Sequence, residues 1–144
     1  MLHLIKDIAD SFFNFLSQDP VRPHIPHSSR IGQNKDIFVS RDEDQKVRAI
    51  TCVSYQTTIP EDESQLFEHT DYPDVAVFYT IWSYEPGAGR ELIFEARSWI
   101  MQNRPEIKRF VTLSPTTEMA KRFHLKNGAN VFRKNTTSVN YEYV

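Results

Sequence analysis

The chain has 144 residues, of which 40% are hydrophobic and 25% are charged, and its formal net charge is −2 at pH 7. This length suits one hydrophobic core, so we expect residues 1–144 to form a single domain. The near-neutral charge excludes the broad basic field that holds nucleic acid or an anionic membrane surface, so we predict neither as a partner. A single cysteine, Cys52, excludes an internal disulfide, and the longest apolar run, 75–82, is too short for a bilayer, so we expect a cytoplasmic protein.

Apolar residues near the N-terminus recur at helix-like spacing, with charged and amide side chains between them: Leu2, Ile5, Ile8, Phe12, Phe15 and Leu16. The pattern predicts an amphipathic helix over residues 1–18 that covers a sheet. Its alternative use is to dock a partner or a second copy of the chain, which would give a homodimer. Three prolines within 19–26 then predict an extended connector, because proline removes a backbone donor and restricts its neighbours.

The rest of the chain predicts a sheet with helices packed on it. β-branched and aromatic residues at 37–39 and 47–55 indicate a hairpin, and 60–67 a short helix. Strand and helix then alternate, with strand 75–83, helix 90–102, strand 109–113, helix 115–126 and two strands within 130–143. A right-handed crossover makes strands 75–83 and 109–113 parallel. The predicted fold is therefore α/β (α+β), with a mixed, mostly antiparallel twisted sheet, a central parallel pair and flanking helices.

The loop at 84–90 lies between a buried strand and the start of a helix, and reads Tyr84-Glu85-Pro86-Gly87-Ala88-Gly89-Arg90. The first turn of a helix carries unpaired N–H groups and a partial positive charge, and glycine lets a phosphate approach them. Arg90 adds a charged donor. A plain tight turn is the alternative interpretation. The loop lacks the Gly-Lys-Ser/Thr of a nucleotide P-loop and the third glycine of a dinucleotide site.

Two segments resemble the GNAT acyl-CoA superfamily. Tyr84-x-x-Gly87-x-Gly89 is similar to its pyrophosphate loop, Gln/Arg-x-x-Gly-x-Gly/Ala, with Tyr84 where Gln or Arg is usual. The resemblance implies a GNAT fold over 75–144 and a coenzyme A contact from this loop, made by Tyr84, Glu85, Gly87, Ala88, Gly89 and Arg90. The stretch 120–129 is similar to Ala-x-x-Leu-Tyr-x-x-x-Gly-Phe, with His124 at the tyrosine position, where imidazole can exchange a proton near neutral pH.

A more specific resemblance is to the catalytic domain of malonyl-CoA decarboxylase, which has the GNAT fold without being an N-acetyltransferase. It rests on Leu113-Ser114-Pro115, on Phe123-His124-Leu125-Lys126-Asn127-Gly128-Ala129 and on Asn140-Tyr141-Glu142-Tyr143. The resemblance implies that Ser114 and His124 are the catalytic pair. Nine residues separate them, so one straight helix would place their Cα atoms roughly 15 Å apart. Such a pair could approach different ends of one thioester, or the helix could begin late.

Decarboxylation of malonyl-CoA leaves a thioester enolate, which needs donors at its oxygen and a proton at carbon. We expect N–H groups near Ser83 to serve the oxygen, His124 to donate the proton and Ser114 to hold the departing carboxylate. Alternatively, Ser114 is only a helix N-cap before Pro115, and His124 is a buried histidine bonded to a backbone carbonyl. Tyr141 and Tyr143 are interpreted as strand residues. N-acyl transfer to an amine, and CoA binding without catalysis, are the rival functions.

The sequence predicts no metal site. His24 and His27 lie three residues apart in the proline-rich connector, but no cysteine or acidic cluster completes a ligand set. Cys52 falls in a strand pattern, so we interpret it as a core residue and a poor nucleophile. The expected partner is therefore a small molecule, an acyl-CoA that serves as substrate.

Overall fold

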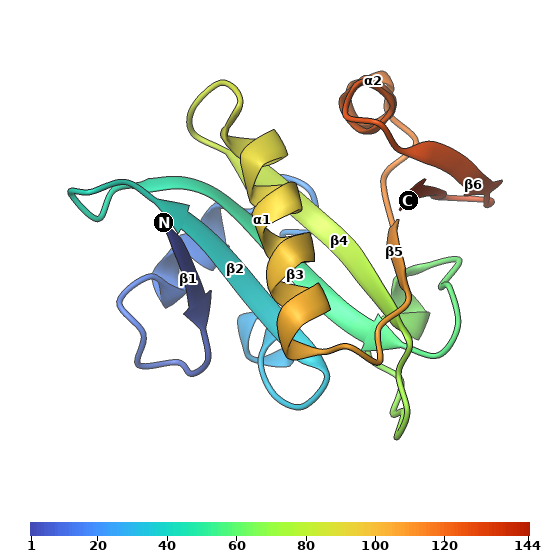
Figure 1. The fold of residues 1–144 in the computed structure, drawn as a ribbon, viewed down its shortest axis with the longest axis horizontal. Coiled ribbons are helices and arrows are strands. Elements are labelled where there is room, and N and C mark those ends of the chain that lie inside the picture. Colours follow the sequence, from blue (N-terminus) through green and yellow to red (C-terminus); the bar gives the residue numbers. More distant parts are fainter.

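A computed structural model describes all residues, 1–144, as seven strands in one sheet of order β1-β2-β3-β4-β5-β7-β6 (Figure 1). The strands are β1 Leu2–Ile5, β2 Lys35–Arg41, β3 Val47–Gln56, β4 Val75–Ser83, β5 Arg109–Thr112, β6 Asn130–Lys134 and β7 Val139–Tyr143. Only β4 and β5 pair in parallel. The α-helices are α1 Ala88–Asn103 and α2 Glu118–Lys126, and the short 3-10 helices are η1 Phe13–Gln18, η2 His27–Arg30 and η3 Glu63–Gln65. The predicted fold class is confirmed.

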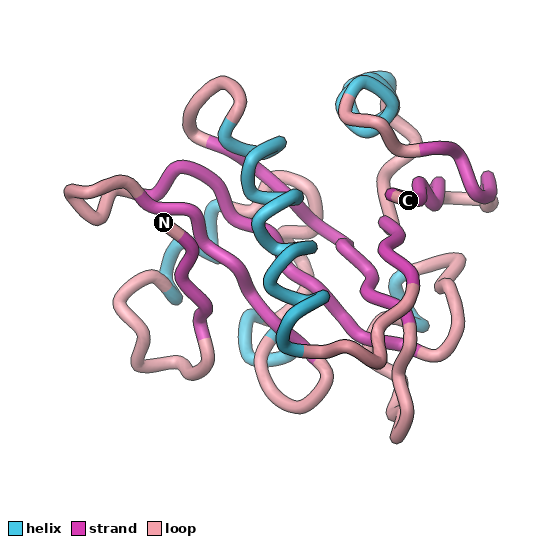
Figure 2. The backbone as a smooth tube through the Cα atoms, viewed as in Figure 1, coloured by secondary structure: helices cyan, strands magenta, loops and turns pink.

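The two faces of the sheet are covered differently. On one face lies α1, which crosses the central strands (Figure 2) and buries Leu92, Ile93, Ala96 and Ile100, with Trp99 partly buried beside them. The 3-10 turns and loops cover the other face, where Phe12, Leu16, Ile25 and Leu66 pack against the sheet. Cys52 belongs to this second layer and is fully buried, which confirms its core assignment. Burial raises the pKa of its thiol to about 11, so it stays protonated at neutral pH.

The predicted N-terminal helix is wrong. Residues 2–5 instead form β1, which pairs antiparallel with β2 from Leu2–Ser40 to Ile5–Ile37. Two aspartates interrupt any helix that follows, because Asp7 accepts the N–H of Ala9 and Asp10 accepts that of Phe12. Pairing with the edge of β2 satisfies the backbone of this segment and buries Ile5, so the tertiary contact overrides the helical periodicity.

Strands β4 and β5 separate after a short parallel stretch. Their pairing runs from Val75–Arg109 to Phe78–Thr112, and one further bond joins the Leu113 N–H to the Phe78 carbonyl. Opposite β3, the register shifts by one residue between Phe78 and Thr80, so Tyr79 is an extra residue on β4. Beyond Tyr79, β4 continues to Ser83. The segment that follows β5 instead turns away from β4, and Ser114 pairs with Val139. The sheet is therefore split at this point.

The helix predicted at 60–67 is reduced to the three residues of η3, where the Asp62 side chain accepts the Ser64 N–H. None of the helices combines the length and the apolar character that crossing a lipid bilayer requires.

Candidate functional site

A cleft of about 360 Å³ opens where β4 and β5 separate. Its walls come from the end of β4, the turn after β5, the first turn of α1 and one side of α2. Gly89, Ser114 and His124 all line it, so residues proposed from three separate motifs meet at one cavity. No Asp, Glu, Lys or Arg is among its lining residues, and its volume lies in the range of small-molecule sites.

The first turn of α1 presents free backbone donors at the cleft. Gly87 adopts φ +81° at the N-cap, a conformation that favours glycine. The Ala88 and Glu91 N–H groups bond to the carbonyls of Glu85 and Gly87, but those of Gly89 and Arg90 have no acceptor in the chain. Two N–H groups at the positive end of a sixteen-residue helix form a site suited to an anion.

The side chains of the loop are already engaged. Arg48 on β3 donates to Glu85 at 3.0 Å and to Glu91 at 2.8 Å, and these bonds raise its pKa. The two carboxylates next to the free N–H groups are thus neutralised. The Tyr84 hydroxyl donates to Gln18 and accepts the Trp82 indole N–H at 3.0 Å, and the Arg90 guanidinium lies over the Phe94 ring. The free donors of this loop are therefore backbone N–H groups and the Arg90 guanidinium, which makes no hydrogen bond in the chain.

Ser114 is not a helix cap. The helix begins later than predicted, at Glu118, and its N-cap is Thr117, whose hydroxyl accepts the Ala120 N–H at 3.2 Å. The Ser114 hydroxyl instead donates to the Thr112 hydroxyl at 2.8 Å, and its backbone exchanges two hydrogen bonds with Val139. Because 114–117 are not helical, the straight-helix separation of Ser114 and His124 does not apply, and both residues line the same cleft.

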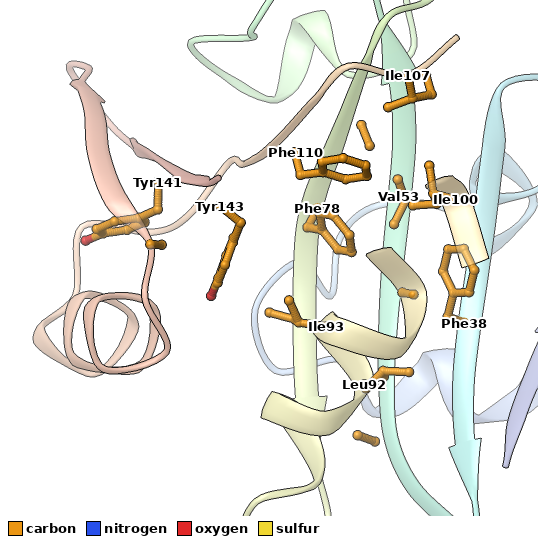
Figure 3. Close-up of a cluster of buried hydrophobic side chains, with 14 of the residues drawn as sticks. Phe38, Val53, Phe78, Leu92, Ile93, Ile100, Ile107, Phe110, Tyr141 and Tyr143 are labelled. Carbon is orange, nitrogen blue, oxygen red and sulfur yellow. The ribbon is translucent and has the colours of Figure 1, made fainter. Parts of the chain in front are cut away.

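His124 is held by two tyrosines of β7, which Figure 3 shows side by side near α2. Its Nδ1 lies 2.7 Å from the Tyr143 hydroxyl, and its ring stacks on Tyr141 at 5.0 Å. The partner is a tyrosine hydroxyl, so the alternative of a bond to a backbone carbonyl is wrong, although the histidine is buried as that alternative required. Tyr141 and Tyr143 are strand residues, as predicted, but they also orient the imidazole. No sequence spacing links them to His124, since only the β5–β7 pairing brings β7 beside the cleft.

The His124 imidazole is neutral at pH 7. It is 4% exposed, and burial lowers its pKa to about 4. Burial also raises the pKa of Tyr143, which therefore remains a hydroxyl. Nε2 makes no hydrogen bond within the chain, and this atom is not fully buried. Since His124 lines the cleft, Nε2 is accessible from there. When Tyr143 donates to Nδ1, Nε2 carries the proton and is a hydrogen-bond donor.

This burial predicts a pH dependence of stability. The pKa of His124 is about 4 in the folded chain and about 6.5 when unfolded, so the unfolded state binds more protons between these values. Stability is therefore full above pH 6.5 and falls as the pH drops toward 4, by about 2 kcal/mol between pH 7 and pH 5. Urea unfolding at both pH values measures the loss, and His124→Gln should remove most of it. An equal loss in His124→Gln would contradict the assignment.

No group of three or more His, Cys, Asp or Glu side chains converges in the structure. His24 contacts the Glu63 carboxylate, and the ring of His27 lies against that of Phe13. The absence of a metal stays a prediction.

Several solved structures have a similar architecture. Malonyl-CoA decarboxylase from Cupriavidus metallidurans superposes on all of this chain with a TM-score of 0.78 and 14% identity, over 60% of its own length. The Agrobacterium vitis enzyme matches 85% of this chain with a TM-score of 0.68 and 21% identity, over 35% of its own length. The GNAT domain of S. lividans PAT matches 99% of this chain and 88% of its own, with a TM-score of 0.67 and 14% identity. The chain has the GNAT fold.

This chain spans 35% and 60% of the lengths of those two decarboxylases. No protein-family model matches the sequence. No curated protein matches it either. At these identities the GNAT likeness describes the fold, and the chemistry has to be argued from the cleft.

Proposed function

We propose that this chain binds an acyl-CoA in the cleft between β4 and β5 and decarboxylates a malonyl thioester there. One observation supports the proposal most: the free N–H groups of α1 lie beside the same cleft that Ser114 and His124 line. The coenzyme A diphosphate would bind at the free N–H groups of Gly89 and Arg90. Glu85 and Gly87 would shape the turn around it, whereas the N–H groups of Tyr84 and Ala88, which the motif also suggested, are already bonded to the Arg48 and Glu85 carbonyls. The thioester would then extend along β4 toward His124.

The uncharged lining favours decarboxylation. A carboxylate in a cleft without Lys or Arg loses its hydration and gains no ion pair, which raises its ground-state free energy. Breaking the bond between the carboxylate and the α-carbon releases neutral CO₂. The electron pair moves onto the thioester as an enolate, which then takes a proton at carbon to give acetyl-CoA.

Backbone groups of β4 are positioned to bind the enolate oxygen. The Tyr84 N–H bonds to the Arg48 carbonyl on the β3 side. Because groups alternate along a strand, the N–H groups of Ser83 and Ile81 point to the other side, where β5 has ended. Both residues line the cleft. The neutral His124 would place its Nε2–H near the reacting carbon or oxygen, and the Ser114 hydroxyl would contact the carboxylate before it leaves.

Incubation with malonyl-CoA tests the proposal directly. We expect acetyl-CoA and CO₂ to form without an added amine. Free CoA that appears only when an amine is supplied would instead show N-acyl transfer, and binding without turnover would show a non-catalytic CoA-binding module. Either result would overturn the decarboxylase proposal.

The size of the residue at 89 should control CoA binding. A Cβ at Gly89 would lie 3.4 Å from the Phe123 ring, an ordinary contact, so Gly89→Ala should be tolerated. The extra methyl groups of Gly89→Val would press on Phe123 and cover the free N–H groups, so we expect CoA affinity to fall about tenfold, the worth of roughly one hydrogen bond to a charged group. Calorimetric titration with CoA measures both variants. Equal affinities would contradict a diphosphate site at this turn.

A further inference from the structure

Arg22 joins the two separating strands. It comes from the proline-rich connector, and its side chain is almost buried. Its Nε donates to the Tyr79 carbonyl of β4 at 3.2 Å, and its Nη2 donates to the Leu113 carbonyl after β5 at 2.8 Å. Tyr79 is the extra residue of β4, and Leu113 makes the last bond between the strands. One guanidinium therefore spans the split just where it begins.

The guanidinium is itself fixed in place. Its Nη1 donates to the Glu63 carboxylate at 2.6 Å, which also contacts His24. Burial opposes ionisation of Glu63, but the hydrogen bonds from His24 and Arg22 outweigh it and lower the pKa of the carboxyl. On the main-chain side, the Arg22 N–H donates to Asp19 at 3.0 Å. Arg22 is thus held at both ends, by charge-assisted hydrogen bonds that are stronger and more directional than neutral ones.

Arg22 also separates two hollows. The cleft is lined by Pro20, Val21, Tyr79 and Leu113, but not by Arg22. A second, polar hollow is lined by Arg22 and Glu63 and shares Leu113 with the cleft. Since the guanidinium bonds to two residues of the cleft wall and lines the second hollow, it lies between the two.

We propose that Arg22 is a positioning residue that clamps β4 and the end of β5 at a fixed spacing and closes the far end of the cleft, making a single-ended site that shields the thioester from water and from an acceptor on that side. The proposal that Arg22 shields the thioester rests on the proposed function, whereas the proposal that it sets the spacing of the strands does not. A site with one open end suits decarboxylation, because this reaction needs no acceptor and the group removed from the thioester leaves as CO₂.

Amide exchange tests the spacing without any substrate. In Arg22→Met, the Tyr79 and Leu113 carbonyls lose their donor while the side-chain volume is nearly kept. We expect the Leu113 N–H to exchange at least tenfold faster than in the parent, measured relative to amides of β2 and β3. Arg22→Lys, which keeps a charged donor, should restore part of the protection. The matched control is Arg133→Met, because Arg133 also donates to two backbone carbonyls, of Ile59 and Pro60, and reaches β5 only through the Asn140 side chain. It should leave Leu113 exchange unchanged.

The ratio of acetyl-CoA to free CoA among the products tests whether Arg22 closes the cleft. Entering water would add to the thioester carbonyl and break the C–S bond, giving malonate and free CoA in place of acetyl-CoA and CO₂. We expect the ratio of acetyl-CoA to free CoA to fall at least tenfold in Arg22→Met, to recover partly in Arg22→Lys, and to keep its parental value in Arg133→Met. If the parent makes no acetyl-CoA, the proposed function fails, and exchange alone decides the role of Arg22. If the parent decarboxylates, an unchanged ratio or unchanged Leu113 exchange in Arg22→Met overturns the inference.

Discussion

His124→Ala is expected to lower kcat for malonyl-CoA by about 10²–10⁴-fold, the usual contribution of a general acid or base. The imidazole lines the cleft with an accessible nitrogen, so its loss removes the group that protonates the enolate carbon. As Nε2 gives up its proton, the Tyr143 hydroxyl proton moves to Nδ1, so the ring stays neutral and the tyrosine oxygen takes the negative charge until solvent reprotonates it. Affinity for CoA should change less than about threefold, because the diphosphate would bind at α1, by charge-assisted bonds that His124 does not share. Steady-state kinetics and calorimetric titration of the same variant separate the two effects.

Two further variants identify what His124 does. Tyr143→Phe keeps the ring but removes the hydroxyl bonded to Nδ1, so the tautomer is no longer set and kcat should fall by less than in His124→Ala. His3→Ala is the matched control, since His3 pairs with Asp10 far from the cleft and should leave kcat unchanged. Turnover that survives in His124→Ala would remove the histidine from the mechanism.

The strand and helix core was predictable because its signals are local. Alternating or continuous β-branched and aromatic residues predicted β2, β3 and β4, and the stripe of α1 has the spacing of a helix that packs on a sheet. The candidate site was predictable only through motif resemblance. His124 and Ser114 were named from short sequence matches, and the structure brings both to one cleft.

The remaining features depend on contacts between distant residues. Whether residues 2–5 form a helix or a strand is decided by the free edge of β2, which no local pattern reveals. The prediction of an extended connector at 19–26 is wrong, because the segment folds into turns in which the Asp19 carboxylate accepts the Val21 and Arg22 N–H groups. Nothing in its composition indicates that Arg22 would bond to carbonyls 57 and 91 residues away. The three prolines were the usable signal, because they keep the segment out of regular structure and leave its side chains free to bond elsewhere.

Arg30→Met is expected to destabilise the fold by about 3–5 kcal/mol, the cost of removing one partner of a buried ion pair. The Arg30 and Asp19 side chains are both 0% exposed, and Nη1 lies 2.8 Å from the Asp19 carboxylate. Arg30 also donates to the Arg22 and Ile25 carbonyls, at 2.8 and 3.1 Å. Its removal leaves a buried carboxylate without its counter-charge and takes a donor from both carbonyls, although the Arg22 carbonyl still accepts the Ile25 N–H. Urea denaturation at pH 7 measures the change in the free energy of unfolding.

The double variant shows whether this cost comes from the unpaired charge. Asp19→Asn with Arg30→Met removes both charges, so it should be less destabilised than the sum of the single variants. Arg109→Met is the control, since Arg109 makes a two-bond pair with Glu142 at the surface and its loss should cost no more than about 1 kcal/mol. A change in Arg30→Met as small as in Arg109→Met would mean that the connector is not anchored by this pair. With the anchor lost, Arg22 would be freed as well, so Arg30→Met should also speed exchange of the Leu113 N–H.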